Sequence, residues 1–289
     1  MPKSKIALVT DSTAYLSPEK VQECNTTVIP LYIHLDEATY RDGVDLDADT
    51  FFQKLKGAPE LPTTSQPSVG DFLELYRRLS RENDAIISIH ISSGISGTVS
   101  AAQMARQTLL DELAELPEIY VIDSQIASCG LALLVTAAAR AIAQGWPAKQ
   151  VAQHSEELAA RIRTLFAVDT LEYLHKGGRI NGAAALFGSA LQIKPILYFR
   201  EGKIEPLEKV RTSKRVKQRI LEIMGEQIQD QPVHICIVHA QVREEAERVR
   251  AYCAARFDCR EIFIEEISPV ISTHVGPGTV AVSFYTVKS

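Results

Sequence analysis

Hydroxylated residues and glycines follow directly after a strongly apolar run in the N-terminal half of the chain. Residues 86–91 form the run, and residues 92–98 (SSGISGT) lead from it into an alanine-rich segment of helical character. A strand, a tight turn and a helix start in this order gather backbone N–H groups and hydroxyls at one point, where the helix dipole favours an anion. The sequence therefore predicts a site for a small anionic headgroup here, with Ser93, Ser96 and Gly97 as candidate residues.

Two other apolar runs also end in polar residues. Residues 6–10 are followed by Asp11 and Ser12, and residues 119–122 by Asp123 and Ser124. Because ligands of parallel α/β sheets collect beyond the carboxyl ends of the strands, these residues form a predicted polar rim along one edge of the sheet. Ser12 therefore joins the candidate site.

His274 is a further candidate site residue. It lies in residues 268–278, which the sequence indicates to be an irregular loop before the last strand, and loops with polar tips often carry function. Asp11, Ser96 and His274 could together form the triad of a small-acid or ester hydrolase; alternatively, Asp11 only caps the turn after the first strand. Both interpretations stay open at this point.

Two small basic clusters occur in a chain whose formal net charge is −5. They are residues 176–179 (KGGR) and residues 211–215 (RTSKR). Each is either a set of solvated loop charges or a docking surface for an acidic or phosphate-carrying partner. The negative net charge argues against a nucleic-acid partner, because there is no basic excess to contact a phosphate backbone.

Several other classes of function are excluded. Residues 276–281 match G-x-G-x-x-A in letters, but too little chain follows for a dinucleotide-binding βαβ unit. Five scattered cysteines without a CxxC motif predict free thiols in a reducing compartment, and neither a metal nor a cofactor is expected. The chain lacks an apolar run of the ~18 residues that would span a membrane, and the apolar stretch near its start is too short for a signal peptide. We therefore expect a cytoplasmic protein.

The first half of the chain alternates apolar strands with helices, which predicts a parallel α/β sheet with right-handed crossovers. One helix is expected after a cap at Ser68, another after the turn at residues 92–98, and a third over residues 129–143, which are apolar nearly all round. Residues 28–33 predict a further strand, residues 62–68 a loop and residues 148–164 a polar helix.

The second half mixes strands and helices in a pattern typical of an α+β unit with antiparallel pairs. Strands are expected at residues 165–168, 193–199, 203–210, 233–238, 261–267 and 279–286; helices are expected from Thr212 or Ser213 and over residues 244–257, and residues 183–191 form another apolar segment. We therefore predict two domains, an α/β domain at residues 1–160 that carries the headgroup-binding turn and an α+β domain with a mixed sheet at residues 161–289.

The chain resembles the DegV family of bacterial fatty-acid-binding proteins, which includes the FakB subunits of fatty acid kinase. The resemblance lies in eight segments that occur in the family's order between about residue 6 and residue 282: VTDSTAYLSPE, TTSQPSVGDF, ISSGISGTVSAA, VIDSQIASCG, LEYLHKGGRI, LQIKPIL, VRTSKR and HVGPGTVAV. Each segment alone is a weak signal, but eight in order are specific.

The resemblance implies a DegV-like fold that holds one long-chain fatty acid between the two domains. It also implies that the carboxylate is bound by Thr64 of the TSQP segment, Ser96 of the SGT turn and His274 of the HVGPG segment. Arg179 of the GGR segment would lie near the headgroup and take part in engaging a kinase.

The same resemblance implies a partner, namely a separate ATP-dependent kinase subunit of the FakA type that makes an acyl-phosphate for phospholipid synthesis. Arg211 and Lys214 fit the family's partner-binding surface. The chain would then be a carrier and not an enzyme by itself. A lipid-sensing regulator whose partner is not a kinase remains an alternative, and transient membrane contact, oligomeric state and the preferred acyl chain stay open.

Overall fold

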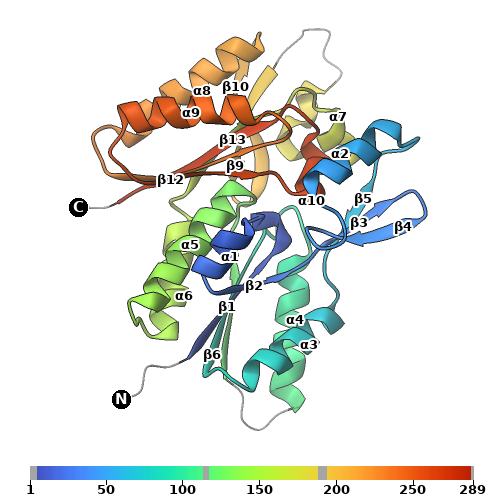
Figure 1. The fold of residues 1–289 in the computed structure, drawn as a ribbon, viewed down its shortest axis with the longest axis vertical. Helices are drawn as coiled ribbons and strands as arrows, with labels where there is room; N and C mark the ends of the chain where they lie inside the picture. Colours follow the sequence, from blue (N-terminus) through green and yellow to red (C-terminus); the bar gives the residue numbers. More distant parts are fainter. Residues whose placement is uncertain (1–4, 113–116, 188–193, 288–289) are drawn as a thin grey trace.

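The computed structural model describes residues 5–112, 117–187 and 194–287. The strands in these ranges form a four-stranded sheet, a six-stranded sheet and a small three-stranded sheet. Helix α5 (Cys129–Ala143) lies between the two larger sheets and contacts strands of both (Figure 1). Its side chains join a core cluster that runs from the first sheet to the second. The apolar composition of residues 129–143 is thus explained by burial on nearly all sides.

The four-stranded sheet is parallel throughout, as predicted. Its strand order is β2-β1-β6-β7, and the strands are β1 (Ile6–Asp11), β2 (Thr26–Ile29), β6 (Ala85–His90) and β7 (Glu118–Asp123). All six residues of β6 are buried, because helices cover both faces of the sheet. Helices α3 (Val69–Ser80) and α4 (Thr98–Glu112) pack on one face, and α5 and α6 (Ala148–Ala159) on the other.

The six-stranded sheet is mixed, which confirms the predicted architecture. Its order is β10-β9-β8-β13-β11-β12, from strands β8 (Arg163–Ala167), β9 (Lys194–Arg200), β10 (Lys203–Val210), β11 (Val233–His239), β12 (Cys259–Glu266) and β13 (Val280–Thr286). Only the β11–β12 pair is parallel among these strands. Helices α8 (Ser213–Ile228) and α9 (Arg243–Arg256) cover the face that points away from α5 (Figure 1).

The three-stranded sheet was not predicted. It consists of β4-β3-β5, with β3 at Tyr32–Leu35, β4 at Ala38–Arg41 and β5 at Thr63–Ser65. The single strand expected at residues 28–33 is therefore wrong: Pro30, which has no N–H to donate, lies between β2 and β3, and these belong to different sheets. The loop expected at residues 62–68 is also wrong in part, because it contains β5.

Two predicted boundaries differ for identifiable reasons. The helix expected over residues 148–164 ends at Ala159, and β8 already begins at Arg163. The loop expected at residues 268–278 contains helix α10 (Pro269–Val275). Ser268 caps α10, since its side chain accepts a hydrogen bond from the backbone N–H of Ile271, and Pro269 suits the first helical position.

The remaining elements are short. They are η1 (Ser12–Ala14), α1 (Pro18–Glu23), α2 (Ala48–Gly57), α7 (Glu172–Lys176) and η2 (Asn181–Leu186). The predicted apolar segment at residues 183–191 begins in η2, and its part from residue 188 on lies outside the described residues, as do the first three residues of the LQIKPIL segment.

Candidate functional site

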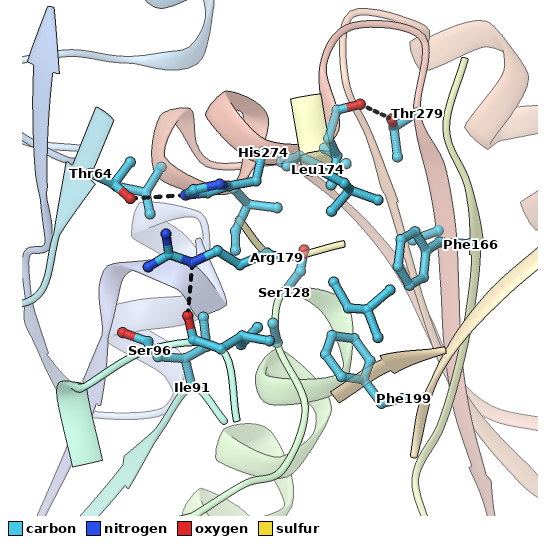
Figure 2. Close-up of a pocket in the computed structure, with 18 of the residues that line it drawn as sticks. Thr64, Ile91, Ser96, Ser128, Phe166, Leu174, Arg179, Phe199, His274 and Thr279 are labelled. Atoms are coloured by element: carbon cyan, nitrogen blue, oxygen red, sulfur yellow. Dashed lines mark hydrogen bonds between the residues drawn. The ribbon is translucent and has the colours of Figure 1, made fainter. Parts of the chain in front are cut away.

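A cavity lies where the N-terminal and C-terminal halves of the chain meet (Figure 2). It encloses about 830 Å³ of empty space, part of it open to solvent, which falls within the ~300–1,000 Å³ typical of small-molecule sites. Most of its wall is apolar and includes Leu31, Ile91, Phe166, Leu174, Phe199, Ile204, Val270 and Ala281. The sequence-predicted residues Thr64, Ser96, Arg179 and His274 all line this cavity.

Thr64 and His274 form a direct hydrogen bond across the cavity wall. Thr64 comes from β5 and His274 from α10, and the distance from Thr64 Oγ1 to His274 Nε2 is 2.9 Å. Strand β5 also pairs with β3, where Thr64 lies opposite Ile33. The unpredicted small sheet therefore positions Thr64, and the unpredicted helix α10 positions His274.

His274 is neutral at physiological pH. Burial, helped by the nearby Arg179 charge, lowers the pKa of its imidazole to about 4. Its Nδ1 is buried without a hydrogen-bond partner among the described residues. Gly177 lies against this nitrogen so closely that a Cβ at position 177 would overlap it. The ring is therefore held on one side by Thr64 and on the other by a residue without a side chain.

Arg179 brings a fixed positive charge to the same side of the cavity. Its Nε donates to the carbonyl of Ile95 at 3.1 Å, and its Nη1 donates to the carbonyl of Gly177 at 2.7 Å. These two bonds connect the turn after β6 with the segment after α7. Figure 2 shows Arg179 between Ser96 and His274, so that the guanidinium lies among the polar residues of the wall.

Ser96 lies in the turn between β6 and α4. Its Oγ is 2.9 Å from Thr98 Oγ1, and the backbone N–H of Thr98 points to the same oxygen at 3.4 Å. Thr98 is the first residue of α4 and is fully buried. The hydroxyl of Ser96 thus lies at the positive end of a 15-residue helix.

The structure does not bring the other three predicted ligand residues to the cavity wall. Ser93 is exposed, and its hydroxyl donates to Asp123. Ser12 is buried, and its Oγ accepts a hydrogen bond from the N–H of Leu31 at 3.0 Å. Gly97 lies against Gln66, because a Cβ at position 97 would be 2.6 Å from Gln66 Nε2. These three residues shape the turns around the cavity.

The hydrolase triad is contradicted by the geometry. Asp11 is fully buried, and its Oδ2 accepts hydrogen bonds from the N–H of Ile91 at 2.8 Å and from His90 Nδ1 at 3.1 Å. His274 instead contacts Thr64, and Ser96 contacts Thr98. Asp11 is therefore committed to holding the ends of β1 and β6 together and does not orient His274.

Asp11 belongs to a chain of buried polar groups. Tyr76 donates to Ser88 Oγ at 2.8 Å, and Ser88 Oγ is 2.7 Å from His90 Nε2. A serine, a histidine and an aspartate are thus in sequence, but all three are fully buried and none lines the cavity. We interpret this chain as structural, since buried polar groups need partners.

Sequence reasoning missed several residues of the wall. Ser128 lines the cavity at the start of α5, and it lies inside the VIDSQIASCG segment, which could have identified it. Phe166 and Phe199 lie on the side opposite Thr64 and Ser96 in Figure 2. No motif marks these two aromatic residues, because they are ordinary strand residues until the sheets pack.

The predicted partner-binding residues Arg211 and Lys214 are both exposed and flank the start of α8. The next basic residue, Arg215, pairs with Glu222 at 2.6 Å. Among the described residues, we find no group of three or more His, Cys, Asp or Glu side chains arranged to hold a metal ion. None of the helices in the described ranges is both long and apolar enough to cross a membrane.

Comparisons with known proteins agree with this geometry. The family described as "Uncharacterised protein, DegV family" matches residues 5–287. A DegV domain-containing protein of Halalkalibacterium halodurans is 39% identical over 287 residues, covering 99% of this chain and 100% of that protein. The solved structure of a DegV family protein from Thermus thermophilus, described by its fatty acid binding, has a TM-score of 0.91 at 33% identity and covers 98% and 100% of the two chains. That of DegV from Bacillus subtilis, described as a fatty acid binding protein, has a TM-score of 0.89 at 36% identity and also covers 98% and 100%.

Proposed function

The chain belongs to the DegV family, and we propose that it binds one long-chain fatty acid in the cavity between its two halves. The observation that carries the proposal is the division of the wall. Thr64, Ser96, Arg179 and His274 lie together on one side, and aliphatic and aromatic side chains form most of the remainder. An anionic headgroup with a long apolar tail matches this division.

The apolar wall accounts for most of the binding free energy. A C16 chain buries about 14 methylenes at roughly 0.8 kcal/mol each, a gross gain of about 11 kcal/mol. Association and ordering of the ligand offset part of this gain. The cavity volume of about 830 Å³ leaves room for such a chain.

The polar side must compensate for desolvation of the carboxylate, which costs several kcal/mol unless it is hydrogen-bonded. Because His274 is neutral, we assign the tautomer in which Nε2–H donates to Thr64 Oγ1, which leaves the Thr64 hydroxyl proton to donate to the carboxylate. The reverse assignment would leave a buried Nδ1–H without a partner among the described residues. Arg179 supplies the opposite charge, and Ser96 a further hydroxyl.

Mass spectrometry of the purified protein, native and then after extraction with organic solvent, tests the proposal. We expect one fatty acid per chain. Ser96→Ala should lower this occupancy, whereas Ser93→Ala, which removes a hydroxyl from the same turn but outside the cavity, should leave it unchanged. A protein that is empty and also takes up no added fatty acid would overturn the proposal.

We further propose that the bound acid is presented to an ATP-dependent kinase subunit of the FakA type, which would form an acyl-phosphate for phospholipid synthesis. The support is the family resemblance together with the exposure of Arg211 and Lys214. The double variant Arg211→Glu/Lys214→Glu should retain its fatty acid but lose kinase-dependent acyl-phosphate formation, with Lys56→Glu, an exposed lysine of α2, as the matched control. A partner other than a kinase recovered in a pull-down, with no acyl-phosphate formed, would instead favour a lipid-sensing regulator.

A further inference from the structure

Two hollows of the molecule share part of one wall. The first is the ligand cavity, and the second is a hollow of about 970 Å³, including open solvent, beside the start of β8 and the end of β9. Thr164 and Phe199 line both. These two side chains therefore stand between the interior cavity and the molecular surface.

This shared wall lies far from the polar residues of the cavity. In Figure 2, Thr64, Ser96 and His274 occupy one side of the cavity, and Phe166 and Phe199 occupy the opposite side. A fatty acid whose carboxylate lies at the polar side would direct its methyl end toward these aromatic rings. Which acyl chains fit is then decided at the shared wall.

Thr164 is the fixed part of that wall. Its Oγ1 is 2.7 Å from Ser283 Oγ, which is also 3.0 Å from Cys129 Sγ. Thr164 and Cys129 are buried, and a Cβ on Gly130 would lie 2.8 Å from Thr164 Oγ1. Hydrogen bonds and close packing thus leave the Thr164 side chain little freedom.

Phe199 is the large and only half-buried part. It lies near the end of β9, with its ring 6.0 Å from the ring of the buried Phe166. The turn that follows β9 is anchored to the headgroup turn, because Ser92 Oγ donates to the carbonyl of Gly202 at 2.7 Å. The backbone at the base of Phe199 is therefore tied to the same turn that carries Ser96.

From this arrangement we infer that Phe199 sets the upper limit of acyl chain length. The inference rests on the proposed fatty-acid binding and adds a specificity-determining residue to it. Removing the phenyl ring joins the cavity to the hollow beside β8, so longer chains can extend past the present wall. A larger ring at the same position moves the wall inward.

The test is a competition titration with saturated fatty acids from C12 to C22 against a fluorescent fatty acid. For the unmodified chain, affinity should rise about fourfold per buried methylene up to a limit and then level off or fall. Phe199→Ala should move that limit to longer acids, and Phe199→Trp to shorter ones. If one variant fails to fold, the other still tests the direction of the shift.

Leu207→Ala is the matched control, because Leu207 lines the outer hollow but not the cavity. It should leave the limit where it is. An unchanged limit in both Phe199 variants, or an equal shift in the Leu207 variant, would overturn the inference while fatty-acid binding itself stands. Failure of the unmodified chain to bind any acid in the series would instead overturn the proposed function.

Discussion

Thr64 and His274 are 210 positions apart in the sequence, and Thr64 Oγ1 lies 2.9 Å from His274 Nε2. This hydrogen bond connects the small three-stranded sheet with helix α10. It closes the polar side of the cavity with residues from both halves of the chain. The carboxylate site therefore forms only when the two halves pack together.

Removing the hydroxyl of Thr64 should weaken fatty-acid binding. Thr64→Val keeps the β-branched shape that suits β5 but removes the donor to the carboxylate, and a hydrogen bond to a charged group contributes about 1.5–3 kcal/mol. Isothermal titration with palmitate should show an affinity loss of roughly one to two orders of magnitude. Thr63→Val, on the exposed neighbour of Thr64, serves as the control. Equal affinity in Thr64→Val and the control would remove Thr64 from the site.

Gly177 should tolerate no side chain. Its φ of −74° is ordinary for any residue, so a Gly177→Ala variant has no backbone strain, but the new Cβ would overlap His274 Nδ1 and displace the imidazole from Thr64. We expect weaker fatty-acid binding in the same titration. Gly225→Ala is the control: nothing lies within 4 Å of its Cβ position in α8, so it should raise the free energy of unfolding by about 0.5–1 kcal/mol. Normal binding by Gly177→Ala would show that the imidazole position does not matter.

Asp11 should govern stability and not chemistry. Asp11→Ala leaves the N–H of Ile91 and the ring of His90 without their buried acceptor, and breaking such a contact costs about 3 kcal/mol or more. Urea denaturation should show this loss. Asp123→Ala, at the exposed end of β7, should lower stability much less. A stable Asp11→Ala protein would mean that the buried chain from Tyr76 to Asp11 contributes little.

Asp42 should make stability depend on pH. Burial raises the pKa of its carboxyl from 3.8 to about 7, while its Oδ1 accepts from the N–H of Val270 in α10 and its Oδ2 has no partner among the described residues. The folded state then holds a proton that the unfolded state releases from about pH 4 upward. The stability contributed by this group is complete below about pH 4 and is lost as the pH rises to about 7.

Urea denaturation at pH 5, 6, 7 and 8 tests that slope. Asp42→Asn keeps the acceptor for Val270 and removes the titrating proton, so it should flatten the decline and be more stable than the parent chain at pH 8. For comparison, the pKa of the exposed Asp45 is lowered to about 2 by its bonds to Arg41, so Asp45→Asn should leave the profile between pH 5 and 8 unchanged. Identical slopes in the parent and in Asp42→Asn would contradict the prediction.

The sequence by itself determined the elements whose causes are local. Continuous apolar runs specified the strands of the parallel sheet, the spacing of Phe72, Leu75 and Tyr76 specified the buried face of α3, and Ser68 was identified as its cap, where it forms a capping box with Asp71. The motif order identified the family. It also pointed to Thr64, Ser96, Arg179 and His274, all of which line one cavity.

Only the tertiary structure decided how those elements combine. Short strands such as β5 exist because a neighbouring strand supplies hydrogen bonds, which is why residues 62–68 resembled a loop. Ser12 and Ser93 follow strands just as the predicted rim requires, yet their hydroxyls bond elsewhere. Phe199 carries no motif, since its position at the shared wall arises from the packing of distant segments. Local periodicity fixes the elements, whereas the shape of the cavity and its end depend on contacts between residues far apart in the chain.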